Sequence, residues 1–93
     1  MSAEHERLLG LVAPLRERGW VFLPTTLAAP TNRHVVDALF GLRTHHSLED
    51  NIQLWEQWAI AARLRKTDQY DTQLWHRSGR IEVIVQELLT LPD

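Results

Sequence analysis

Cysteine is absent from this 93-residue chain. Its absence excludes a disulfide framework, an iron–sulfur cluster and a cysteine-ligated zinc site, and it removes the need for an oxidising compartment. No run of about 18 apolar residues is present to cross a bilayer as a helix. The first residues, Met1–Glu6, are acidic where a signal peptide would be basic. We therefore expect a single soluble domain over residues 1–93, cytoplasmic and without membrane insertion.

Lysine is scarce: of the ten basic residues, Lys66 is the one lysine and the other nine are arginine. Twelve acidic residues bring the formal net charge to −2. The chain therefore has no overall positive field that would attract nucleic acid or an anionic membrane, and any such contact would have to be local. The four glycines, at positions 10, 19, 41 and 79, are too far apart to form a phosphate-binding loop.

Helical spacing of apolar residues is present near the N-terminus. Residues 3–18 follow Ser2, a suitable N-cap, and Leu8, Leu11 and Leu15 recur at intervals that place them on one helix face. Pro14 is expected to kink this helix or to start a second short one. The apolar run at 20–23 is too short for a helix, so we predict a short extended segment there.

Two more helices are predicted in the middle of the chain. Val35, Leu39 and Leu42 indicate a helix over about 32–42. A longer helix is expected over about 47–66, since Ser47 and Asp50 resemble a capping box. Apolar residues then gather on one of its faces: Leu48, Ile52, Trp55, Trp58, Ala59 and Ala62.

The last segment is open to two interpretations. As a helix over about 72–90, it would place its C-terminal apolar residues within an arc of roughly 160°. As a hairpin over 73–85, it would turn at Ser78-Gly79. We favour the helix, and therefore a mostly α, small four-helix domain. The alternative is a winged-helix-like α+β fold, which it resembles only in the order of its elements.

The sequence shows no catalytic signature. No nucleophile elbow is present, and none of the five histidines has a partner at the spacing that puts two imidazoles on one helix face. The pair His45-His46 is the single histidine cluster, and we interpret it as polar loop surface. We expect no enzyme, no metal and no cofactor.

Apolar residues on a second side of the predicted third helix point to a partner. Ile60 and Leu64 project opposite the main stripe, and a helix on the surface of a monomer normally keeps that side polar. Trp58 and Trp75 are further anchor candidates, because tryptophan is enriched at interface hot spots. Arg63, Arg65 and Arg77 would form a polar rim.

We therefore predict a small protein-interaction or regulatory module that self-associates as a homodimer, compatible with a phage-type or accessory modulator of a host protein. The rival interpretation is nucleic-acid binding by local basic clusters. It would use Arg63, Arg65 and Lys66 together with Arg77 and Arg80. The acidic residues at the start of the predicted third helix, Glu49 and Asp50, argue against contact with DNA at that end.

Overall fold

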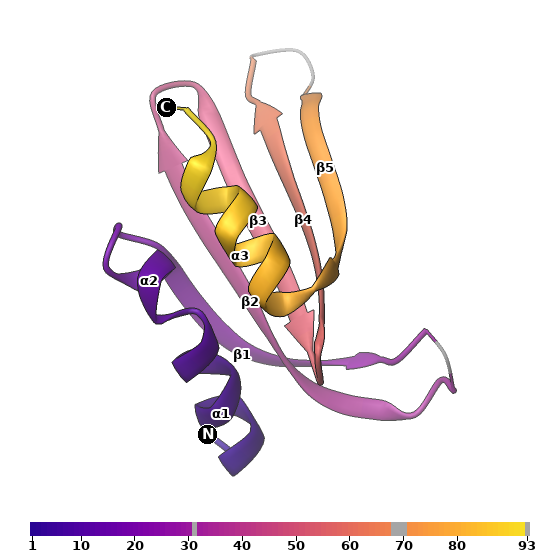
Figure 1. The fold of residues 1–93 in the computed structure, drawn as a ribbon. Coiled ribbons are helices and arrows are strands. Elements are labelled where there is room, and N and C mark those ends of the chain that lie inside the picture. Colours follow the sequence, from indigo (N-terminus) through magenta and orange to yellow (C-terminus); the bar gives the residue numbers. More distant parts are fainter. Residues whose placement is uncertain (31, 68–70, 93) are drawn as a thin grey trace.

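The fold is known from a computed structural model, which describes residues 1–30, 32–67 and 71–92 (Figure 1). Five strands form one antiparallel sheet in the order β1-β2-β3-β4-β5, so that each strand pairs with the next one along the chain. Helices stand at the two ends of the chain. In order, the elements are α1 (Ala3–Leu11), α2 (Ala13–Arg16), β1 (Val21–Ala28), β2 (Val35–His45), β3 (Leu48–Trp55), β4 (Trp58–Arg65), β5 (Thr72–Arg80) and α3 (Ile81–Thr90).

The prediction of a mostly α, four-helix domain is wrong, because half of the chain forms a five-stranded sheet. The winged-helix-like alternative is wrong as well. The segment expected as a helix over 32–42 lies largely in β2, and the one expected over 47–66 is the β3–β4 hairpin. A hairpin over 73–85 does not form either. Instead β5 pairs with β4 and the chain enters α3 at Ile81. The structure matches the predicted helices only at the chain ends, in α1, α2 and α3.

Two tight turns explain how the expected third helix becomes a hairpin. His46 and Ser47 connect β2 to β3, and Glu56 and Gln57 connect β3 to β4. The first residue of each turn has a positive φ, 55° at His46 and 51° at Glu56. Two-residue connections with left-handed backbone reverse the chain at once and suit the twist of antiparallel strands. The turn at Glu56 and Gln57 falls in the middle of the segment expected as one helix, so the chain reverses there and its two halves pair as β3 and β4.

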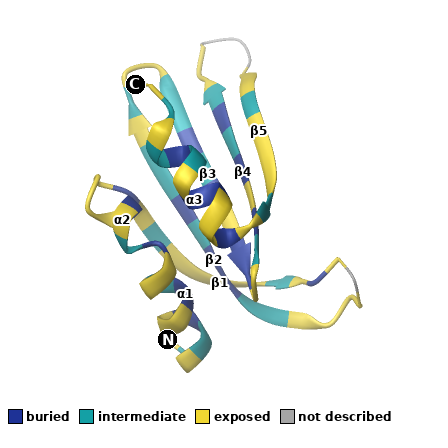
Figure 2. Cartoon of the chain, in the orientation of Figure 1, coloured by how far each residue is buried: buried dark blue, intermediate teal, exposed yellow. Residues whose placement is uncertain are grey.

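All three helices pack against the same face of the sheet (Figure 1). From α3, the apolar side chains Ile81, Ile84, Val85 and Leu88 are buried. They meet sheet residues from β2, β3 and β4 and the buried residues of the N-terminal helices in one core, whose members are dark in Figure 2. Each fully buried aliphatic side chain of this kind stabilises the fold by about 1.5–3 kcal/mol. We call this side of the sheet the covered face.

Gly41 makes room for an aromatic ring on the covered face. Its cross-strand neighbours are Phe22 on β1 and Ile52 on β3. A Cβ at position 41 would lie 2.7 Å from Phe22 Cδ1 and 2.8 Å from Ile52 Cγ2. Glycine is therefore needed here for close approach and not for its backbone freedom. Phe22 stacks in turn on Trp20, with ring centroids 6.1 Å apart.

The histidine at position 5 ties α1 to the first strand. The Ser2 backbone N–H donates to His5 Nδ1 (3.2 Å), so the ring proton is on Nε2. Nε2 donates that proton to the Thr25 carbonyl oxygen at 2.9 Å. Next to it, Arg7 donates to the Glu4 carboxylate and to the Glu56 carbonyl, and its hydrogen bond to Glu4 holds the pKa of that carboxyl below its usual value. These contacts join the N-terminal helix to β1 and to the β3–β4 turn, which lie at the same end of the sheet.

Two glycine substitutions are expected to change stability in opposite directions. In Gly41→Ala, the new methyl group overlaps Phe22 and Ile52, and we expect a loss of about 1–3 kcal/mol. Gly10→Ala places a methyl group in open space on α1, and we expect a gain of up to about 1 kcal/mol. Urea unfolding of both variants measures the difference. Equal effects of the two substitutions would show that the Gly41 site is not tightly packed.

Candidate functional site

No described helix lies on the second face of the sheet, which is the side away from the helices in Figure 1. Because side chains alternate along a strand, the residues between the core positions point to this side. We call it the open face, and its central part consists of Val21, Leu23, Phe40, Leu42, Asn51, Gln53, Ile60, Ala62, Leu64, His76 and Ser78.

The open face is apolar where an antiparallel sheet normally carries polar side chains toward water. Leu23 on β1 is 58% exposed and its neighbour Val21 is 61% exposed. Ile60, at the middle of β4, is 37% exposed. The strands reach these positions through the backbone pairing Leu23↔Phe40↔Gln53↔Ile60, which brings residues far apart in sequence into one row. An uncovered apolar row of this kind is typical of an interaction surface.

A stripe of side-chain amides divides the apolar surface. Asn51 and Gln53 project from the central strand β3, between the apolar residues of β2 and those of β4. None of the central residues of the open face is acidic, lysine or arginine. Charged groups lie at its ends, with Glu49 at one end and Arg80 at the other. The surface is therefore apolar and hydrogen-bonding, but its centre is uncharged.

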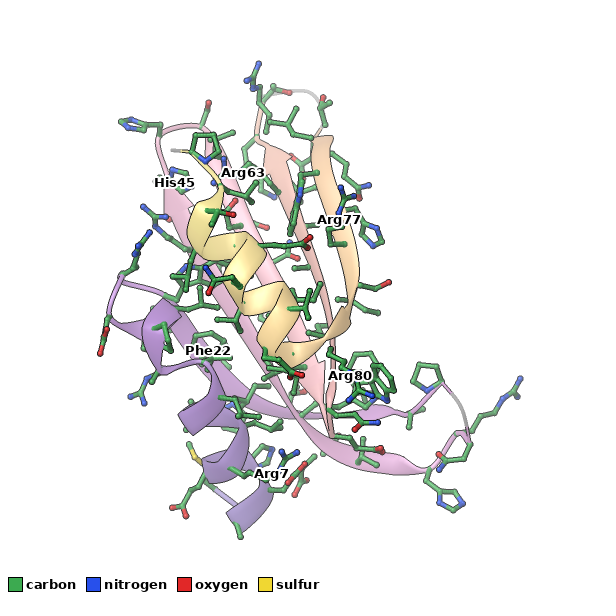
Figure 3. The ribbon with its side chains drawn as sticks, in the orientation of Figure 1. Arg7, Phe22, His45, Arg63, Arg77 and Arg80 are labelled. Carbon is green, nitrogen blue, oxygen red and sulfur yellow. The ribbon has the colours of Figure 1, made fainter. Side chains whose placement is uncertain are left out.

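One end of the open face is closed by the β1–β2 hairpin. A second small core forms there from Ala29, Ala38 and Trp55, with Trp58 packed against it. Next to this core is an apolar pocket of about 240 Å³. Its lining residues are Pro30, Trp55, Trp58, Ala59, Ile60 and Ser78. The Arg80 guanidinium lies over the Trp58 ring, 5.5 Å from its centroid, at the edge of this region (Figure 3).

The structure brings together three of the four predicted partner-binding residues. Trp58, Ile60 and Leu64 occupy alternate positions of β4 and point to the open face, although the strand replaces the helix from which they were predicted. Trp75 lies on the other side, where it packs against the main core. It therefore does not contribute to this surface.

The predicted basic residues do not form one patch. Arg63, Arg65 and Arg77 belong to the covered face by strand register, and Arg80 belongs to the open face. Arg77 lies 3.9 Å from the Glu87 carboxylate. Lys66 pairs with Asp71 at 2.9 Å, and this hydrogen bond raises the pKa of the lysine. The nucleic-acid alternative stays a prediction, but no described observation favours it.

A buried ion pair uses the arginine that both predictions had placed on the surface. Arg63 Nε donates to Asp50 Oδ1 at 2.6 Å and its Nη2 donates to Oδ2 at 3.0 Å. His45 Nε2 lies 3.1 Å from Asp50 Oδ2, and Arg63 Nη1 also donates to the Pro92 carbonyl. Asp50 is only 2% exposed. This cluster joins β2, β3, β4 and the C-terminal segment, and its burial gives it a structural role.

The sequence analysis missed the half of the open face that β1 and β2 provide. Residues 20–23 are all apolar, and successive side chains of an extended segment point to opposite sides, so this run already indicated apolar residues on both faces. Phe40 and Leu42 had no such signal, because β2 has apolar residues on both sides and its pattern also fits a helix.

Comparison with family models, with curated proteins and with solved structures finds no significant match to this chain. Within the described residues, no helix is long and apolar enough to cross a membrane. Among the same residues, no group of three or more histidine, aspartate or glutamate side chains is placed to hold a metal ion.

The buried ion pair predicts a contrast between two acid-to-amide substitutions. Asp50→Asn leaves the Arg63 guanidinium buried without its counter-charge, and we expect a loss of about 3–5 kcal/mol. Glu4→Gln removes the partner of Arg7 at the surface, where we expect a loss of less than about 1 kcal/mol. Chemical denaturation of both variants measures the contrast. A small effect at Asp50 would contradict the structural role of the cluster.

Proposed function

We propose that this protein is a protein-interaction module that self-associates through the open face of its sheet. The observation that carries the proposal is the apolar row across β1, β2 and β4, in which Leu23 and Ile60 are exposed on the side that no described helix covers. Burial of such a row is favourable at about 25 cal/mol for each Å² of apolar surface. We propose the cytoplasm as its compartment.

A second copy of the chain is the partner that the chemistry of the face favours. Two sheets pack face to face at about 10 Å, with their inner side chains interdigitated. The amides of Asn51 and Gln53 both donate and accept hydrogen bonds, so the same residues in a second copy are suitable partners for them. The uncharged centre avoids like-charge repulsion when two identical faces meet.

The size of the face is sufficient for a reversible dimer. Five strands at about 4.8 Å spacing, with about six residues each at 3.3 Å on the part that the hairpin leaves open, cover roughly 475 Å². Two copies would bury roughly 950 Å² in total, which is in the range of weak and transient protein interfaces. We therefore expect association that depends on protein concentration rather than a permanent dimer.

Gln53→Glu tests whether the open face is the interface and whether the partner is a second copy of the chain. Two copies would bring two new carboxylates together at the centre of the interface, and we expect the dimer to weaken at least tenfold. Sedimentation velocity over a range of concentrations measures the effect. Gln86→Glu, an exposed residue of α3, is the matched control and is expected to leave the association unchanged.

Ile60→Thr tests the apolar contribution while it keeps a β-branched side chain in the strand. We expect this variant to shift the chain toward monomer. Val83→Thr on α3 is the control, since Val83 is 52% exposed on the opposite side of the molecule. A wild-type chain that remains monomeric at millimolar concentration, with both variants indistinguishable from it, would rule out self-association.

A further inference from the structure

The two edges of the sheet are not equivalent. At the β1 edge, Pro24 has no backbone N–H to donate. At the next residue, the Thr25 carbonyl already accepts a hydrogen bond from His5 Nε2. Successive residues of a strand turn their backbone groups to opposite sides, so one of these two features falls on the outer side of β1. This edge is therefore protected against the addition of another strand.

The β5 edge has neither feature. Thr72–Arg80 contains no proline, and the described helices lie over the covered face rather than along this edge (Figure 1). About half of the backbone N–H and C=O groups of an edge strand point away from its single neighbour. One of the carbonyls of β5, that of His76, accepts a hydrogen bond from the exposed side chain of Arg77 at 3.1 Å. An exchange of this local contact for an incoming strand costs little.

The charges on β5 select the chemistry of the incoming strand. The strand contains Arg77, Arg80 and His76 but no aspartate or glutamate, and the carboxylate of Glu87 on α3 lies 3.9 Å from the exposed Arg77 side chain. Arg77 and Arg80 are three positions apart, so they point to opposite faces of the sheet. Two β5 strands of two copies would bring these arginines together, and like charges on neighbouring strands are destabilising. An extended segment with acidic side chains has the complementary charge.

We propose that the β5 edge binds an acidic, extended segment of a partner protein as a sixth strand of the sheet. Backbone hydrogen bonds supply the binding, and carboxylates on either face of the added strand reach Arg77 and Arg80. This proposal goes beyond self-association. It uses an edge that remains accessible when two copies pack through their open faces, and it stands if the chain is monomeric.

The test uses a synthetic peptide as long as β5, made of valine and threonine, with two glutamates three positions apart to match Arg77 and Arg80. It is titrated into the isotope-labelled 93-residue protein, and backbone amide shifts are followed by NMR. The expected result is saturable binding, with shifts concentrated in Thr72–Arg80 and new protection of its amides from solvent exchange. Shifts concentrated in β1, or no binding at millimolar peptide, would overturn the proposal.

Two altered peptides separate strand addition from simple charge attraction. A peptide with alternate backbone nitrogens methylated keeps its charges but cannot form the ladder, so it is expected to bind at least tenfold more weakly. Replacement of both glutamates by lysine is expected to abolish binding. If the methylated peptide bound as tightly as the original, the contact would be electrostatic adsorption and the sixth strand would be excluded.

Variants of the protein complete the experiment. The double variant Arg77→Gln/Arg80→Gln is expected to weaken binding about tenfold. Arg16→Gln/Arg18→Gln removes the same charge from the segment around α2 and is expected to bind like the wild type. The NMR spectra report at the same time whether each variant is folded. Equal weakening in both double variants would contradict a site at β5.

Discussion

Burial of α3 against the middle of the sheet is the contact on which the other features depend. Its buried residues, from Ile81 to Leu88, cover β4 at the small side chains Ala59 and Ala61, which let the helix approach closely. The C-terminal segment beyond α3 is held by the Pro92 carbonyl, which accepts from Arg63, and Arg63 is itself neutralised by Asp50. Packing of α3 therefore explains the small residues of β4, and the segment that follows the helix contacts the buried ion pair.

The three described helices are short, and together they cover one face of the five-stranded sheet. Helices α1, α2 and α3 are all on the covered face, and the open face keeps its apolar side chains without cover from any described helix. Ile60 and Leu23 are exposed on the open face because all the described helices pack against the covered face. The open face leaves apolar side chains without cover, and the β5 edge leaves backbone N–H and C=O groups without a neighbouring strand in the described sheet.

The two parts of the candidate site were predictable to different extents. Ile60 and Leu64 were predicted as surface anchors because they project opposite the main apolar stripe, and Trp58 because tryptophan is enriched at interface hot spots. All three point to the open face even though the element is a strand. Arg63 was misplaced, since its burial depends on Asp50, which is thirteen positions earlier in the chain and directly opposite on the neighbouring strand. No local pattern of β4 contains that information.

The sequence by itself determined the local features: the helices at the two ends, the lack of cysteine and the excess of apolar residues in the middle of the chain. Only the tertiary structure decided that the middle forms strands. In β4, alanine, leucine and arginine favour a helix intrinsically, and apolar residues on both sides remove the alternation that indicates a strand. The strands form because their backbone groups find partners on neighbouring strands and their covered side packs against α3, and both of these contacts join residues far apart in the sequence.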